Sequence, residues 1–346
     1  MWPFWLLFLI PAWAVLQPNR LRKQQATFAW VVVGIIFTLM MGLRHEVGGD
    51  WINYLPQFDD AQRLKFSEVL LKDDPGYVFL NWLVGKMGGD IYGVNLICAV
   101  VMMWGTIAFC RNQPNPWLAL TIAVPYMLIV VGMGYTRQGV ALGFALLGLC
   151  ALGRGQVLKF IIWVAIGATV HKSAVLLLPI AALATSKNRI FTLAMVGTST
   201  FLLYYLLLAD QSESLWTNYV DVQLQSEGGL IRVLMNVVPA LILFAFRDKL
   251  VQDPKERPLW LWMAVFAVVC LPLVGLASTA VDRVALYLIP LQLFVFARIP
   301  TLASTIHVRT ILVVSVVAYY AIVQFVWLNF ATHAYGWVPY QFMPLD

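Results

Sequence analysis

Charged residues are scarce in this sequence: they make up 12% of its 346 residues, about half the share found in a typical soluble domain. Hydrophobic residues make up 61%, and the mean hydropathy is +0.79. This composition excludes a soluble protein. Because a helix needs about 20 apolar residues to cross the hydrocarbon core of a membrane, we expect on the order of ten to twelve crossings in a single membrane domain over 1–346.

The sequence also lacks the motifs with which many enzymes hold nucleotides and metal ions. It has no glycine-rich phosphate loop ending in Gly-Lys-Ser/Thr, no Gly-x-Gly-x-x-Gly after a strand and no His-Glu-x-x-His. Cysteines are few as well, and the four of them lie in or next to apolar runs without a Cys-x-x-Cys pair. A bound nucleoside triphosphate, a structural zinc ion and a disulfide framework are therefore disfavoured.

Twelve apolar runs are predicted to cross the membrane, and the two runs within 158–186 are also compatible with one broken hairpin. The predicted crossings are 2–16, 27–43, 91–110, 116–134, 136–153, 158–170, 172–186, 190–209, 230–246, 258–280, 284–297 and 310–330.

The net charge of +6 would suggest a nucleic-acid partner in a soluble protein, but basic loop residues set the orientation of a membrane protein, so we expect no nucleic acid. If the crossings alternate from an N-terminus outside the cell, the inside loops hold 14 of the 23 lysines and arginines and only three acidic residues. This distribution follows the positive-inside rule and places both termini outside. The run 2–16 has its basic residues after it, so we expect an uncleaved anchor there rather than a signal peptide.

Two polar loops are predicted on the outside. The longer one, 44–90, contains several aromatic residues and is expected to be structured, with an interfacial helix over 61–71. A short helix is expected over 75–87, because Asp74 before Pro75 is typical of a helix start. The second loop, 210–229, is acidic.

Four arginines stand at outer ends of crossings, where the positive-inside rule disfavours them: Arg44, Arg137, Arg232 and Arg283. One such arginine alone is more often an interfacial anchor, but four on one face indicate a shared function. Arg137 follows the turn Gly132-Met133-Gly134-Tyr135 and starts a helix after Thr136, a possible cap. A helix N-terminus beside a guanidinium favours phosphate binding. The alternative is a plain tight turn.

Acidic residues and a histidine are predicted at the same face. Asp50 follows two glycines and precedes Trp51 and Tyr54, which is typical of a sugar site, but it could equally cap a helix at 51–58. Helix capping is favoured for Asp74 and Asp90, and Asp282 could cap the eleventh crossing in the same way. His171 is either a general base or phosphate-binding donor, or a hydrogen-bonded structural residue.

Taken in order, these residues resemble a known family. The matching positions are Arg44, Gly49-Asp50-Trp51, Tyr54, Asp74-Pro75-Gly76-Tyr77, Leu80-Asn81, Arg137-Gln138, His171-x-Ser173-Ala174, Asp282-Arg283 and Tyr287. Over about residues 40–290 the sequence resembles the EpsG family of exopolysaccharide polymerases. That family is similar to the Wzy-type polymerases and belongs with the GT-C glycosyltransferases. The resemblance thus adds a GT-C-like architecture to the all-α polytopic fold expected from the apolar runs.

The resemblance implies an enzyme of the bacterial plasma membrane that joins oligosaccharide repeats held on undecaprenyl diphosphate at the extracytoplasmic face. The expected partners are this lipid-linked oligosaccharide, membrane lipids, and a chain-length regulator with other exopolysaccharide assembly proteins. Two alternatives stay open. One is a GT-C glycosyltransferase that takes a single sugar from a polyprenyl monophosphate, with fewer cations and a metal ion on Asp50 and Asp74; the other is a lipid-linked oligosaccharide flippase.

A lipid diphosphate substrate assigns roles to the residues that match. Arginines that hold the diphosphate stabilise the departing oxygen and could replace a metal ion, so no metal cofactor is expected. We assign Arg44, Arg137, Arg232 and Arg283 to the diphosphates. A base must take the proton from the acceptor hydroxyl, and Asp50 is the first choice with His171 the second. Sugar binding is assigned to Trp51, Tyr54, Gln138 and Asp282.

Overall fold

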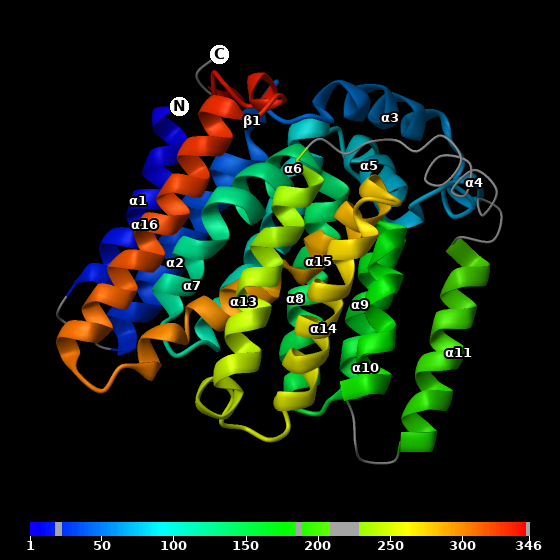
Figure 1. Ribbon diagram of the computed structural model, residues 1–346. Coiled ribbons are helices and arrows are strands. Elements are labelled where there is room, and N and C mark those ends of the chain that lie inside the picture. The colour runs from blue at the N-terminus through cyan, green and yellow to red at the C-terminus, as the bar shows by residue number, and fades with distance from the viewer. Residues whose placement is uncertain (18–22, 185–188, 208–227, 344–346) are drawn as a thin grey trace.

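Helices that run between two ends of the molecule make up nearly all of the structure (Figure 1). The computed structural model describes residues 1–17, 23–184, 189–207 and 228–343. Within these ranges the only strands, β1 (Arg44–His45) and β2 (Gln341–Phe342), are two residues long. The described chain is therefore all-α, as the sequence predicts.

Each predicted apolar run corresponds to one helix or to two consecutive helical segments, but the break predicted at 281–283 is wrong and lies at 274–277 instead. In chain order these are α1 (Trp2–Leu16), α2 (Lys23–Gly42), α6 (Ile91–Arg111), α7 (Pro116–Ala123) with the π-helix η1 (Val124–Gly132), α8 (Thr136–Gly153), α9 (Val157–Val170), the 3-10 helix η2 (Lys172–Leu177) with α10 (Leu178–Ala184), α11 (Arg189–Leu207), α13 (Gly229–Leu250), α14 (Arg257–Leu273), α15 (Ser278–Phe296) and α16 (Ile306–Phe330).

Six helices in the described ranges are long and apolar enough to cross a membrane, namely α2, α6, α8, α13, α15 and α16. The remaining apolar helical stretches are shorter, between 10 and 17 residues, with α11 counted over Ile190–Tyr205. The apolar stretch 158–186 is interrupted at His171, where the backbone is extended between α9 and η2. This set of helices is that of a multi-pass membrane protein, whereas the count of twelve crossings and the GT-C architecture stay predictions.

Small residues let α6 and α8 pack closely. A Cβ atom at Gly105 would lie 2.1 Å from the carbonyl oxygen of Gly143, and a Cβ atom at Gly143 would lie 2.9 Å from the Cα of Met102. Any side chain at either glycine would push the two helices apart, and small residues at helix contacts are typical of membrane bundles. This contact fixes α8, whose first turn contains Arg137.

Buried amide side chains connect three other helices. Gln292 on α15 donates to Asn236 Oδ1 on α13 at 2.6 Å, and Asn236 donates to the carbonyl of Ala285 at 2.8 Å. Tyr320 on α16 donates its hydroxyl proton to Gln292 Oε1 at 2.8 Å. Hydrogen bonds of this kind hold helices together where no water competes. They fix α13 close to Arg232, which lies one turn before Asn236.

Three short helices lie across one end of the bundle: α3 (Trp51–Arg63), α4 (Phe66–Val69) and α5 (Pro75–Lys86) (Figure 1). The helix predicted over 61–71 is wrong, because α3 ends at Arg63 and the backbone is extended at Leu64. A new helix starts at Phe66, since the backbone N–H of Lys65 donates to the Glu68 carboxylate at 2.7 Å. The helix expected over 75–87 is α5, which ends one residue earlier.

The N- and C-terminal ends of the described chain lie at the same end of the bundle as α3 (Figure 1). There β2 pairs antiparallel with β1, with Arg44 opposite Phe342. The loops and helix termini at the other end contain Arg154, Lys159, Lys249, Lys255, Arg257, Arg298 and Arg309. The acidic loop predicted at 210–229 lies outside the described residues except for Gly228 and Gly229.

Candidate functional site

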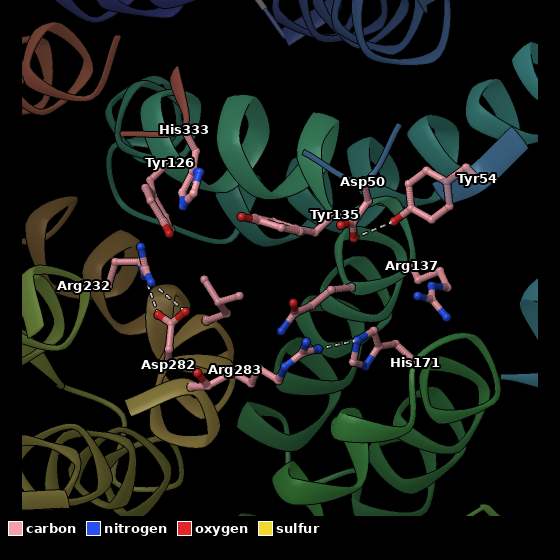
Figure 2. A pocket seen from close by; sticks show the side chains of 13 residues that line it. Asp50, Tyr54, Tyr126, Tyr135, Arg137, His171, Arg232, Asp282, Arg283 and His333 are labelled. Atoms are coloured by element: carbon pink, nitrogen blue, oxygen red, sulfur yellow. Dashed lines mark hydrogen bonds and ion pairs between the residues drawn. The ribbon is translucent and has the colours of Figure 1, made fainter. Parts of the chain in front are cut away.

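A pocket of about 470 Å³ opens beside the start of α3, and Figure 2 shows the side chains that line it. Its lining residues are Asp50, Tyr54, Tyr126, Tyr135, Arg137, Gln138, His171, Arg232, Thr279, Asp282, Arg283, Leu286 and His333. They come from α3, η1, α8, α13, α15, three turns and the C-terminal segment. Eight of the ten residues predicted for the site line this pocket: Asp50, Tyr54, Arg137, Gln138, His171, Arg232, Asp282 and Arg283.

Asp50 occupies the N-cap position of α3 but does not cap the helix. Its side chain makes no hydrogen bond to the first helical amides. The carboxylate lines the pocket instead, and Tyr54 donates its hydroxyl proton to Asp50 Oδ2 at 3.4 Å. The interpretation of Asp50 as a helix cap is therefore wrong. Burial raises the pKa of the Asp50 carboxyl, while the positive charges of Arg137 and Arg283 act in the opposite direction.

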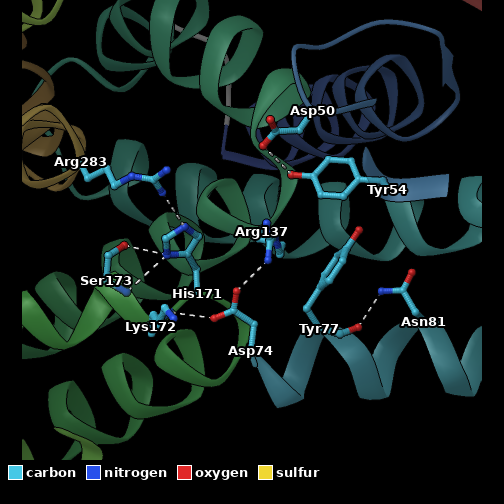
Figure 3. Close-up of polar contacts among 10 residues, drawn as sticks. All are labelled: Asp50, Tyr54, Asp74, Tyr77, Asn81, Arg137, His171, Lys172, Ser173 and Arg283. Carbon is cyan, nitrogen blue, oxygen red and sulfur yellow. Dashed lines mark hydrogen bonds and ion pairs between the residues drawn. The ribbon is translucent and has the colours of Figure 1, made fainter. Parts of the chain in front are cut away.

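Asp74 belongs to the same group of side chains, although the sequence predicts only a helix cap there. Its side chain does not cap α5. The carboxylate accepts hydrogen bonds from Arg137 Nη1 at 2.9 Å and from the backbone N–H of Lys172 at 3.1 Å (Figure 3). Asp74 is 8% exposed, and a buried carboxylate needs such partners to stay charged. It thereby joins α5, α8 and the start of η2, and it orients Arg137.

The guanidinium of Arg137 is surrounded by its carboxylate partner and two aromatic rings. The rings of Tyr54 and Tyr77 have their centroids 6.0 and 5.8 Å from Arg137 Cζ, which is within the range of cation–π attraction. The side chain of Arg137 is nevertheless 30% exposed, and it lines the pocket. Arg137 is thus held in one place with part of its surface open to a ligand.

His171 stands at the turn between α9 and η2 and is 9% exposed. Ser173 Oγ lies 2.7 Å from His171 Nδ1 and 3.1 Å from the hydroxyl of Tyr287. On the other side of the ring, Arg283 Nη1 lies 3.4 Å from His171 Nε2 (Figure 3). Burial, followed by the charges of Arg283 and Arg137, lowers the pKa of His171 to about 3. The imidazole is therefore neutral near pH 7 and is a weak base.

Arg232 on α13 and Asp282 on α15 form a two-point ion pair within the pocket (Figure 2). Arg232 Nε contacts Asp282 Oδ1, and Nη2 donates to Oδ2 at 2.7 Å. The cap predicted at Asp282 is wrong, because α15 already begins at Ser278 and places Asp282 and Arg283 inside the helix. The partner on the neighbouring helix explains this position, since a charge-matched pair costs far less to bury than a lone carboxylate.

Arg44 and Trp51 do not line the pocket. Arg44 is 1% exposed, and its guanidinium donates to the carbonyls of Val47 and Met41 and to Thr136 Oγ1, the last at 2.7 Å. Trp51 is 5% exposed, with its ring 5.8 Å from Arg44 Cζ. Their predicted roles in diphosphate and sugar binding do not fit these positions. Arg44 links the end of α2 to α8 instead, and Thr136 is its acceptor rather than a helix cap.

Several lining residues are not predicted from the sequence. Tyr126 lies within an apolar run, and His333 comes from the segment after α16. No local pattern marks either residue, because their place at the pocket depends on how distant segments pack. Tyr135 does have a local signal, since it follows the glycine turn. Asp74 does not line the pocket but contacts Arg137, and it has a signal as the first residue of the Asp-Pro-Gly-Tyr segment.

The arrangement combines cations that can hold an anion with a carboxylate that can accept a proton. Three arginines and two aspartates line one cavity, together with the neutral His171 and with His333. Among the residues that the structure describes, no three His, Cys, Asp or Glu side chains come close enough to hold a metal ion. Independence from metal ions stays a prediction. Guanidinium groups can meet the charge of a phosphate by themselves through charge-assisted hydrogen bonds.

Comparison with known proteins gives a match to a family model. The EpsG family profile matches residues 27–342, nearly the whole chain. Nothing among curated proteins and nothing among solved structures matches. The matched range includes every residue that lines the pocket.

Proposed function

The chain belongs to the EpsG family and is a membrane protein of the polysaccharide-polymerase type, and we propose that it joins oligosaccharide repeats held on undecaprenyl diphosphate. The observation that supports this most strongly is the meeting of three arginines and Asp50 in one pocket. A diphosphate leaving group needs cationic side chains to stabilise its charge, and an acceptor hydroxyl needs a carboxylate to take its proton. The GT-C architecture is part of the same proposal.

The arginines act on the leaving group. When the bond between the anomeric carbon and the diphosphate oxygen breaks, the electron pair stays on that oxygen, and its charge grows in the transition state. Arg137 and Arg283 stabilise this charge from fixed positions, which costs no reorganisation during the reaction. Arg232 is paired with Asp282 and contributes a donor on the far side of the pocket. Gln138 and Asp282 contact the sugars.

Asp50 acts on the acceptor. Its carboxylate takes the proton from a sugar hydroxyl while that oxygen bonds to the anomeric carbon of the donor. Its raised pKa makes Asp50 a stronger base than an exposed aspartate. His171 has a pKa of about 3 and lies beside Arg283, so protonation of its ring is unfavourable. We therefore assign proton transfer to Asp50 and hydrogen bonding to the anion to His171.

Purified protein incubated with lipid-linked repeat units tests the proposal. We expect a ladder of products that differ by whole repeat units. A single added sugar would identify the transferase that uses a polyprenyl monophosphate, and an unchanged substrate would favour a flippase. The transferase alternative also relies on Asp74 as a metal ligand, whereas the Asp74 carboxylate contacts Arg137 and the Lys172 N–H.

We further propose that the pocket faces the outside of the bacterial plasma membrane, with both termini on that side. The proposal rests on the basic residues at the opposite end of the bundle, which the positive-inside rule assigns to the cytoplasm. Single cysteines replacing Asp60 and Tyr335, both well exposed, should react with an impermeant thiol reagent in intact spheroplasts. A cysteine at Gln252 should not react until the membrane is opened. The unsubstituted chain is the control, and the reverse labelling pattern would invert the topology.

A further inference from the structure

The two turns that present Asp50 and Arg137 to the pocket contact each other. The backbone N–H of Asp50 donates to the carbonyl of Gly134 at 3.2 Å. Gly48 has a φ of +117°, and a Cβ atom there would lie 2.3 Å from the carbonyl oxygen of Met133. The glycines of both turns are thus required by protein packing. From the sequence alone, the glycines before Asp50 and Arg137 are interpreted instead as backbone that a ligand can approach closely.

Trp337, from the segment after α16, fills the space beside both turns. A Cβ atom at Gly134 would lie 2.0 Å from Trp337 Cζ2, and one at Gly49 would lie 3.3 Å from Trp337 Cη2. The indole is 1% exposed, and its Nε1–H donates to the carbonyl of Ile129 at 2.9 Å. The ring therefore touches the turn before Asp50 and the turn before Arg137 at the same time.

The chain on both sides of Trp337 is held in place independently of these ring contacts. The Gly48 N–H donates to the carbonyl of Gly336 at 2.7 Å, and the Tyr340 hydroxyl donates to the carbonyl of Met40 at 2.7 Å. Further along, the Met343 N–H donates to the carbonyl of Leu43 at 2.9 Å. The same C-terminal segment also supplies His333 to the pocket wall. The position of the indole beside the two turns is consequently fixed by the chain on both sides of it.

We infer that Trp337 is a positioning residue for the reaction proposed above, on which this inference rests: its indole sets the separation between the Asp50 turn and the Arg137 turn. Asp50 serves the acceptor and Arg137 the leaving group, so their separation must match the distance between the two reacting ends. A displacement of about 1 Å in such an arrangement can lower the rate by about 10²-fold.

Substitutions that change the side-chain size at Gly134 and Trp337, singly and together, test this inference. Gly134→Ala adds a methyl group where the indole lies, and we expect turnover to fall by about 10-fold to 10²-fold with little change in KM. Trp337→Phe removes the distal ring atoms that contact the two turns. We expect turnover to fall by about tenfold, here because space is left empty rather than overfilled. In the double variant the smaller ring makes room for the methyl group, so its turnover should exceed that of Gly134→Ala by about tenfold.

Two control variants match these changes. Gly275→Ala places a methyl group where no atom lies within 4 Å, and Tyr335→Ala removes an aromatic ring that is 80% exposed in the same C-terminal segment. Both should keep the turnover of the unsubstituted protein. Hydrogen exchange of the Asp50 amide gives a readout that does not need the reaction. Its exchange should speed up in each single variant and slow down again in the double variant.

The outcomes separate the two proposals. If the unsubstituted protein makes no polymer, the proposed function fails, and the exchange measurement alone decides the role of Trp337. Full turnover and unchanged exchange in both single variants would overturn the inference. So would single variants that lose folded protein without recovery in the double variant, because that is the behaviour of an ordinary core residue.

Discussion

Asp50→Asn should lower turnover by roughly 10²-fold to 10⁴-fold and leave the binding of the lipid substrate nearly unchanged. Asparagine keeps the shape of the side chain and can still accept the hydrogen bond from Tyr54, but it cannot take a proton. Asp59→Asn is the matched control, since Asp59 lies on the same helix, is exposed and does not line the pocket. Turnover and substrate affinity are measured separately on purified protein.

The pH dependence of turnover identifies the base independently. A carboxylate base works only when ionised, so turnover should fall as the pH drops through the pKa of Asp50. Burial raises that pKa, and the fall should therefore occur above the ordinary range of aspartate. His171, with a pKa of about 3, stays neutral through this range and produces no such fall. If His171→Ala abolishes turnover and Asp50→Asn is close to the unsubstituted protein, the roles are reversed.

Arg137→Lys should lower polymerisation by about 10²-fold while the protein still folds. Lysine keeps the positive charge opposite Asp74, but it loses the planar fork that donates to two phosphate oxygens at once. Arg137→Ala should be less active still. It also leaves the buried Asp74 carboxylate with one partner fewer, which destabilises the fold by itself.

A double variant separates these two effects of Arg137→Ala. Adding Asp74→Asn removes the unpaired charge, so the amount of folded protein should recover. Activity should not recover, because the guanidinium is still missing. Recovery of both would mean that Arg137 acts only through folding, and full activity in Arg137→Ala alone would remove it from the site. Folded protein is measured by thermal unfolding, and activity by polymer length.

The sequence predicts those features of this protein that depend on neighbouring residues. Most of the apolar runs appear as helices with nearly the expected bounds, because hydropathy is a local property. The exception is the pair of runs predicted at 258–280 and 284–297, since α14 already ends at Leu273 and α15 already begins at Ser278. The prediction for Asp90 is confirmed for the same reason: its side chain accepts from the backbone N–H groups of Tyr92 and Gly93. The meeting of eight predicted site residues at one pocket also follows, since crossings alternate and bring the ends of distant helices together.

The predictions that fail concern residues whose partners lie far away in the sequence. Asp74 and Asp282 look like Asp90 in sequence, but each has an arginine on another helix that competes for its carboxylate. In the sequence both Arg44 and Arg137 stand at an outer end of a predicted crossing. In the structure the Arg44 guanidinium is buried and donates to the backbone carbonyl of Val47. Trp337 is not predicted at all, because its contacts depend on the C-terminal segment returning to two glycine turns that lie more than 200 residues earlier.

The lipid released per glycosidic bond is the most direct test of the central claim. Purified protein is given repeat units on undecaprenyl diphosphate, and the free lipid is identified and counted against the bonds formed. A polymerase that uses the pocket as proposed should release one undecaprenyl diphosphate for each repeat that it joins. Release of a monophosphate lipid, or bond formation without release of diphosphate lipid, would contradict the proposal.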